Sequence, residues 1–356
     1  MPWGGNDCGG LQFLHSRRNS GRSRHNYAFP TANGWREQKR VWMTLPARAP
    51  AFQMIAGVTI AILLANAAHA QDRGTLNPEP PPPLANPGDP DTPAKELFGR
   101  KAGPAAMEAR TIGFYSKGCL AGAKALPING KTWQVMRLSR NRNWGHPNLI
   151  AVLERLANQA PKAGWRGLLV GDMSQPRGGP MRTGHASHQV GLDADIWLTP
   201  MPAHQLTRKE REEMSATMVV AEDRLDVDPQ VWTPAHVGVI RAAAKDPEVE
   251  RIFVNAAIKK ALCRDAGNGD RTWLHKVRPF FGHDYHFHVR IRCPADSPQC
   301  KAQEPTGNAE GCGHELDEWF TDEVLHPKPA PIPPKPKPPL HMADLPGACR
   351  QVLLAP

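Results

Sequence analysis

Histidine and aspartate side chains gather in two short stretches of the chain. In GHASHQVGLDADIW, residues 184–197, His185 and His188 lie three residues apart, and Asp195 follows seven residues later. In GHDYHFHVRIRC, residues 282–293, His286 and His288 are separated by one residue. Such side chains can form a solvated surface, a local hydrogen-bond network or the ligand set of a metal ion. Their concentration in two motifs favours the metal site.

A catalytic zinc site needs three protein ligands of the histidine and carboxylate type and keeps a fourth position open for water. His188, Asp195 and His288 can supply that set from two separate segments. Zinc lowers the pKa of its water and polarises a carbonyl group. A neighbouring histidine that is not a ligand, for which His286 is the candidate, can accept the proton of the water or stabilise an oxyanion. The residue types therefore predict metal-assisted hydrolysis.

The first stretch combines a loop with a β-strand. From Leu192 onwards apolar and polar residues alternate, as they do in a strand with one buried face. The apolar row consists of Leu192, Ala194 and Ile196. Asp195 lies on the opposite row, and we expect it to face a cleft above the sheet. Gly191 permits a tight turn that brings His188 back towards Asp195.

The second stretch shows the same alternation. Its apolar row consists of Phe287, Val289 and Ile291. His286 and His288 occupy the other row, about 7 Å apart, so that both can reach one ion or one of them can act beside it. Arg290 and Arg292 share this row and argue against a buried pair of neutral histidines.

Helices and strands alternate elsewhere without regular βαβ spacing. Residues 146–161, 233–247 and 256–263 are predicted helices, the first with Pro147 in its first turn. Residues 167–173 and 251–255 are predicted strands. This pattern indicates an α+β fold, with a single catalytic domain and a small, mostly antiparallel central sheet flanked by helices and long loops.

The N-terminal 70 residues have the features of a leader. Arg40 and Arg48 precede the apolar run MIAGVTIAILLANAA, which closes on Ala68-His69-Ala70. This order predicts a signal peptide cleaved near Ala70, with Met43 as an alternative start. The alternative is an N-terminal membrane anchor, for which the apolar run is short. We expect no transmembrane anchor in the mature form.

Composition divides the remaining chain. Residues 71–95 form a proline-rich linker, residues 96–325 the predicted catalytic domain, and residues 326–356 a proline-rich tail. Residues 1–70 carry eight Lys and Arg against two Asp and Glu, so without them the net charge falls from +10 to +4. That weak charge, without a basic helix bearing aromatic residues, gives no indication of a nucleic-acid partner.

Cysteine content agrees with export. Cys8 lies in the leader, and six of the seven cysteines remain after it. An even number in an exported chain predicts disulfides. Cys293 and Cys300 form the easiest local pair, and a pairing of Cys349 would tie the tail back to the domain. The alternative is zinc thiolates, but there is no CxxC pair.

The motif S-H-x-x-G-x-x-x-D, residues 187–195, together with H-x-H at residues 286–288, resembles the lysostaphin/D-Ala-D-Ala metallopeptidase group. The longer strings RIFVNAAIKKALC, KVRPFFGHDYHFHVRIRCPADSPQC and GCGHELDEWF closely resemble the penicillin-insensitive murein endopeptidases of that group. The resemblance runs from about Gly113 to Phe320 and includes the tail around Cys349.

The resemblance implies a periplasmic, zinc-dependent endopeptidase that cleaves D-alanyl–meso-diaminopimelate cross-bridges in the cross-linked peptides of peptidoglycan. His188, Asp195 and His288 then match the ligands of the catalytic zinc, with His185 also near that metal. His286 matches the catalytic histidine, and His283 matches the histidine that precedes it.

The resemblance also implies further features. A second, outer zinc in the family is held by an aspartate and a histidine three residues apart. Here Asp223 and Asp226 occupy those positions, and the alternative for two carboxylates on a polar loop is simple solvation. The implied disulfides are Cys119–Cys349, Cys263–Cys312 and Cys293–Cys300.

Two other functions remain open at this point. One is a D,D- or L,D-carboxypeptidase that trims free stem peptides. The other is a non-catalytic, zinc-stabilised module that binds peptidoglycan. The presence of both His286 and His288 favours an enzyme over a binding module.

Overall fold

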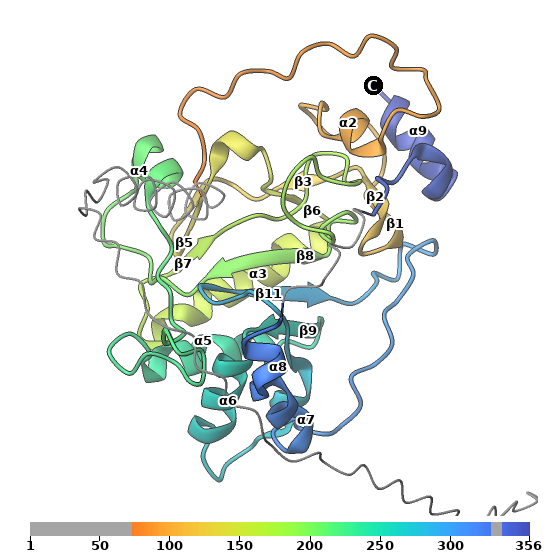
Figure 1. Ribbon diagram of the computed structural model, residues 1–356. Helices are drawn as coiled ribbons and strands as arrows, with labels where there is room; N and C mark the ends of the chain where they lie inside the picture. The colour runs from red at the N-terminus through yellow and green to blue at the C-terminus, as the bar shows by residue number, and fades with distance from the viewer. Residues whose placement is uncertain (1–72, 329–336) are drawn as a thin grey trace, which may run out of the picture. The chain divides into compact units, whose positions relative to one another are not determined.

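The computed structural model describes residues 73–328 and 337–356 (Figure 1). The predicted leader, with its apolar run and Met43, lies outside the described residues. Within the described part of the chain, no helix has both the length and the apolar character that a membrane span requires.

A seven-stranded mixed sheet forms the centre of the fold, in the order β10-β9-β11-β8-β7-β5-β4. The pairs β10–β9 and β5–β7 are parallel, and the other four are antiparallel. The strands are β4 (Asn129–Gly130), β5 (Trp133–Val135), β7 (Leu168–Val170), β8 (Asp193–Trp197), β9 (Val249–Val254), β10 (Val277–Pro279) and β11 (His286–Ile291). Two small sheets pair β1 (Arg110–Phe114) with β2 (Lys117–Ala121) and β3 (Lys124–Ala125) with β6 (Trp144–Gly145). The predicted α+β class and mostly antiparallel sheet are confirmed.

The described α-helices are α2 (Ala94–Phe98), α3 (Pro147–Gln159), α4 (Arg208–Glu213), α5 (Pro234–Lys245), α6 (Ala256–Asp265), α7 (His314–Asp317), α8 (Asp322–Leu325) and α9 (Ala348–Leu354). Three helices, α3, α5 and α6, contribute buried residues to the core on the face of the sheet that carries the apolar rows, whereas α2 and α9 belong to a separate hydrophobic cluster. In Figure 1, α3 passes behind the sheet. Its buried leucines join Ile196 of β8 and Phe287 of β11 in one hydrophobic core. The predicted helices and strands are confirmed, including Pro147 at the start of α3.

The opposite rows of β8 and β11 are also buried, which differs from the expectation drawn from the arginines. His288 and Arg290 are 4% and 5% exposed, whereas Arg292 is exposed. Arg290 tolerates burial because its Nε donates a hydrogen bond to Asp193 Oδ1 at 2.7 Å, so the two charges are paired. The arginine on this row therefore did not exclude a buried histidine pair.

Three disulfides stabilise the domain, and they are the pairs that the resemblance implies: Cys119–Cys349, Cys263–Cys312 and Cys293–Cys300. The first joins β2 to α9, and the two elements pack against each other. Arg177 adds to this attachment, because its Nη1 donates to the carbonyl oxygens of Val352 and Leu353, both at 3.0 Å. The tail is thus held against the domain, while the predicted domain boundaries remain predictions.

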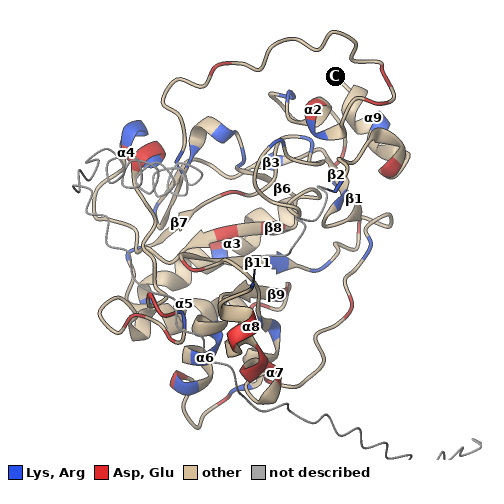
Figure 2. Ribbon diagram, viewed as in Figure 1, with Lys and Arg blue, Asp and Glu red and all other residues tan. Residues whose placement is uncertain are grey.

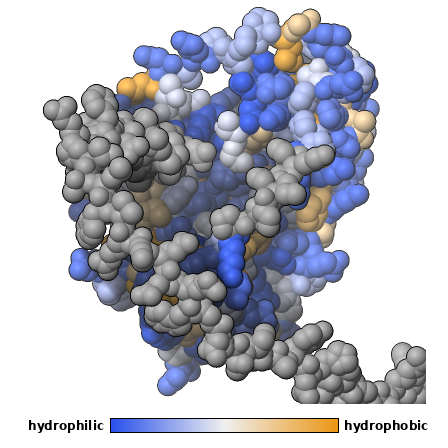
Figure 3. Space-filling model, in the orientation of Figure 1, coloured by the Kyte–Doolittle hydropathy of each residue, from blue (hydrophilic) through white to orange (hydrophobic). Residues whose placement is uncertain are grey.

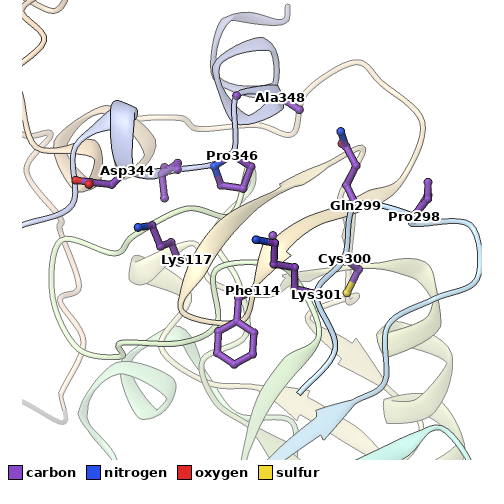
Figure 4. Close-up of a pocket in the computed structure, with 12 residues that line it drawn as sticks. Phe114, Lys117, Pro298, Gln299, Cys300, Lys301, Asp344, Pro346 and Ala348 are labelled. Atoms are coloured by element: carbon purple, nitrogen blue, oxygen red, sulfur yellow. The ribbon is translucent and has the colours of Figure 1, made fainter. Parts of the chain in front are cut away.

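Charged residues of both signs are interspersed over the described elements, and acidic residues gather on α7 and α8 (Figure 2). The described part of the face shown in Figure 3 is largely hydrophilic, with scattered apolar residues. A pocket of about 610 Å³ opens between the β1–β2 hairpin and the tail, lined in part by Lys117, Lys301 and Pro346 (Figure 4). None of the clustered histidines lines this pocket.

Candidate metal centre

The pairing of β8 with β11 brings the two predicted motifs together. In this antiparallel register His288 lies directly opposite Asp195, and Arg290 lies opposite Asp193. His286 is two residues from His288 on the same row, opposite Trp197. Side chains at paired positions on one face have Cβ atoms about 5 Å apart. The register therefore places carboxylate and imidazole groups within reach of one another.

His188 enters the same site from the loop before β8. Its backbone adopts a φ of +65°, which is unusual for a residue other than glycine. The main-chain N–H of His188 donates to Asp193 Oδ2 at 3.2 Å, which holds this conformation. Gly191 has a φ of +72°, and a Cβ there would lie 2.4 Å from a methyl carbon of Leu120. The tight turn expected at Gly191 is present.

Three side chains form a compact group that could hold a metal ion. The ligand atoms of His185, His188 and Asp195 all lie within 4.8 Å of one another. Nε2 of His188 is 3.4 Å from Asp195 Oδ1, and Nε2 of His185 is 3.4 Å from Asp195 Oδ2. His288 approaches the same carboxylate, with Nδ1 3.4 Å from Oδ1. Asp195 is thus the common neighbour of these three histidines, and His286 also approaches it, with Nε2 3.7 Å from Oδ1.

The position of the proton on His288 leaves an unprotonated nitrogen facing Asp195, where a cation could bind. Nε2 of His288 lies 2.8 Å from Asp193 Oδ1. Because an ionised carboxylate only accepts hydrogen bonds, Nε2 carries the proton of the neutral ring, and Nδ1 presents a lone pair to Asp195. Asp195 Oδ1 and both ring nitrogens of His188 are buried without a hydrogen-bond partner. His288 Nδ1 and Asp195 Oδ1 are therefore two buried acceptors that face each other at 3.4 Å, and a cation between them would offset the cost of burying them.

The spacing of these atoms also suits a tetrahedral ion. Ligand atoms about 2.0–2.2 Å from zinc lie roughly 3.3–3.6 Å from one another. Asp195 Oδ1 is 3.4 Å from His188 Nε2 and 3.4 Å from His288 Nδ1. These separations are too long for strong hydrogen bonds. The donor set therefore fits a metal ion.

The charges of the two aspartates in the site also favour a bound cation. Burial acts to raise the pKa of Asp195, but His188, His286 and His185 lower it, and the net pKa lies well below its usual value. Burial also acts to raise the pKa of Asp193, but Arg290 and His288 hold it below its usual value. Both carboxylates are therefore ionised at neutral pH. One charge is balanced by Arg290, and the other faces the group of histidine nitrogens.

His286 and His283 stand beside this group as neutral bases. Burial lowers the pKa of His286 to about 3 and also lowers the pKa of His283. The two rings lie 4.7 Å apart. Nδ1 of His283 is 3.0 Å from the carbonyl oxygen of Phe281. Since that oxygen can only accept, Nδ1 carries the proton, and Nε2 of His283 is free of it.

A further carboxylate near the group was not predicted from the sequence. Asp172 Oδ2 lies 3.1 Å from His185 Nε2 and accepts hydrogen bonds from Arg140 at 3.0 Å and Arg142 at 2.8 Å. His185 is therefore shared between Asp172 and Asp195. No local pattern marks Asp172, because it follows β7 and reaches the site only through the sheet order.

Asp223 and Asp226 lie outside this group and are engaged in other contacts. Asp223 Oδ1 accepts from the N–H of Leu225 at 3.0 Å. Asp226 Oδ2 accepts from Arg264 Nη1 at 2.7 Å, and Oδ1 accepts from the N–H of Val227 at 2.7 Å. A second ion here would have to displace the Arg264 pair.

The α+β fold brings a His–His–Asp group next to two neutral histidines. A metal-dependent hydrolase needs such metal ligands with a base beside them, and the fold and site define this class of protein. The family model described as penicillin-insensitive murein endopeptidase matches residues 111–354. The chain belongs to this family and is a metallopeptidase that acts as a murein endopeptidase.

Similar proteins carry the same description. A penicillin-insensitive murein endopeptidase of Haemophilus influenzae is 48% identical over 251 residues, which is 70% of this chain and 84% of that protein. One from Klebsiella pneumoniae is 46% identical over 250 residues, covering 70% and 88% of the two chains. One from Escherichia coli is 44% identical over the same shares. The predicted family is confirmed.

Proposed function

We propose that this protein is an exported, periplasmic zinc endopeptidase that cleaves D-alanyl–meso-diaminopimelate cross-bridges of peptidoglycan. His188, Asp195 and His288 hold the catalytic zinc, with His185 beside it. His286 and His283 are the proposed catalytic histidines, which transfer protons during the reaction. Family membership and the three disulfides support an exported murein hydrolase.

The residue that supports a single shared ion best is Asp195. Its Oδ1 has no hydrogen-bond partner, although it is buried and lies 3.4 Å from one nitrogen each of His188 and His288. Zinc bound there would lower the pKa of a water molecule and polarise the scissile carbonyl group. The proton transfers of the reaction are then carried out by the side chains around the ion.

We assign to His286 the transfer of the proton of the attacking water. Its Nε2 lies 3.7 Å from Asp195 Oδ1, and its Nδ1 is buried without a hydrogen-bond partner. A neutral imidazole can accept the proton of the water and later return it to the leaving amine. The ring centroid of His283 lies 4.7 Å from that of His286, and the unprotonated Nε2 of the neutral His283 ring can accept a proton from the site.

The test compares purified substrates and metal content. The mature protein should contain about one zinc per chain and should split cross-linked muropeptide dimers into monomers, read by mass. Free pentapeptide stems should remain intact, whereas loss of their terminal D-alanine would indicate a carboxypeptidase. The variant His286→Ala should keep its zinc and lose at least about 100-fold in activity. Full activity in this variant would contradict the role given to His286.

A further inference from the structure

Exposed aromatic side chains lie next to the candidate metal centre. Phe280 and Phe281, in the loop after β10, are 51% and 60% exposed, and the ring of Phe281 lies 4.9 Å from that of Trp319. We call Phe280, Phe281 and Trp319 the aromatic surface. Trp319 is half-buried, and exposed aromatic rings that cluster as Phe280 and Phe281 do mark interaction sites.

The aromatic surface is continuous with the histidines of the site. The ring of Phe280 contacts that of His283 edge-on, with centroids 5.5 Å apart. Phe280 also contacts Phe253, 5.5 Å away, and Phe253 in turn lies 5.2 Å from the ring of His288. A substrate positioned at the histidines would therefore meet this surface as it leaves the site.

Both segments of the aromatic surface are anchored to α6. Asn255, the N-cap of α6, donates from Nδ2 to Asp284 Oδ1 at 2.5 Å, and its main-chain N–H donates to the carbonyl oxygen of His283. The Cys263–Cys312 disulfide joins α6 to the segment just before α7 and Trp319. The rings are thus held in place before any ligand arrives, which lowers the entropic cost of binding.

The charged residues around Trp319 favour binding of the glycan strand of peptidoglycan over binding of its stem peptides. Acidic residues gather on α7 and α8 (Figure 2). The exposed ones on α7, η4 (Glu318–Phe320) and α8 are Glu315, Asp317, Glu318, Asp322 and Glu323. Stem peptides carry carboxylates, which these acidic side chains disfavour, although Arg224 also lines the small pocket between Phe281 and Trp319, and Arg278 pairs with Glu315. The N-acetylated sugars of the glycan strand are uncharged and present apolar C–H faces, which pack well on aromatic rings.

We propose that the aromatic surface binds the glycan strand beside the cross-bridge under attack. This inference rests on the proposed function, because it names the part of the same substrate that the surface recognises. Sugars stacked on Phe281 and Trp319 position the peptide at the histidines. The enzyme then prefers cross-links that are still attached to glycan.

The test measures kcat/KM on two substrates that share one cross-linked peptide. One dimer keeps its disaccharides, and in the other they have been removed enzymatically. The wild type should favour the sugar-bearing dimer by roughly 3- to 10-fold. Phe281→Ala should bring that ratio close to one, and Phe281→Tyr should restore it. Ile128→Ala, which removes another exposed apolar side chain elsewhere, should leave the ratio unchanged.

The outcomes separate this inference from the proposed function. A wild-type ratio near one, or a ratio that Phe281→Ala leaves intact, would overturn glycan binding while cleavage itself still stands. Failure of the wild type to cleave either dimer would instead refute the proposed function, and the glycan inference with it.

Discussion

His288 and Asp195 lie directly opposite each other on β11 and β8, and Nδ1 of the histidine is 3.4 Å from Oδ1 of the carboxylate. Nε2 of the same ring forms a hydrogen bond of 2.8 Å with Asp193 Oδ1. A lone pair of His288 therefore faces an ionised carboxylate in a buried site. This arrangement is unfavourable without a cation, and the predictions about metal binding depend on it.

Removal of a ligand should abolish tight metal binding. Asp195→Asn and His288→Ala should each lower zinc affinity by at least about 100-fold, because each removes or weakens one of the three proposed ligands. Metal content after dialysis against a chelator-buffered solution measures this loss. His204→Ala is the matched control, since His204 is an exposed histidine paired with Glu210. His185→Gln should have the smaller effect, because His185 is shared with Asp172; an equal loss would assign it a full ligand role.

Asp193 should support both the fold and the metal. Its carboxylate pairs with Arg290 and orients His288, so Asp193→Ala leaves a buried guanidinium without its partner. We expect a loss of about 3–5 kcal/mol in the free energy of unfolding. Zinc affinity should fall by about 10- to 100-fold. Urea denaturation and competition with a chelator measure the two effects, and unchanged zinc affinity in a folded variant would contradict the orienting role.

Lys259 should make stability depend on pH above neutrality. Burial lowers the pKa of Lys259 to about 7, from an ordinary value of 10.5. Between these values the unfolded chain holds a proton that the folded chain has released, so the free energy of unfolding rises with pH. From pH 7 to 9 the rise should be on the order of 2 kcal/mol.

The variant Lys259→Met should lack that rise, as measured by urea denaturation across the same pH range. Lys162→Met, which replaces an exposed lysine, should keep it. Parallel curves for the wild type and Lys259→Met would show that Lys259 remains charged in the folded chain.

The tail disulfide should contribute more to stability than the local one. Cys119–Cys349 closes a separation of 230 residues, and Cys293–Cys300 closes one of 7. Loop-closure entropy then predicts that Cys119→Ala/Cys349→Ala costs about 3 kcal/mol more than Cys293→Ala/Cys300→Ala. Thermal or urea denaturation of the two double variants tests this order. An equal cost would mean that the contacts of α9 and Arg177 hold the tail without the disulfide.

The sequence by itself determined which residues share a face of each strand. A strand alternates its side chains with a period of two, so Asp195 separates from Ile196, and His288 separates from Phe287, whatever the rest of the chain does. Helical periodicity likewise located α3 and α5. The motifs around His188 and His288 were specific enough to indicate the family.

Only the tertiary structure decided what these side chains contact. The register of β8 with β11 pairs residues that are 89 to 97 positions apart, and no local pattern encodes that pairing. This register lets Asp193 contact both His288 and Arg290. The ion pair with Asp193 allows Arg290 to be buried, although the sequence indicated that the arginines of this row would lie outside the core. Asp172 joins the site through the order of strands in the sheet. Hydrogen bonds and ion pairs act over a few ångströms, so proton positions and charges were settled only once distant segments were in contact.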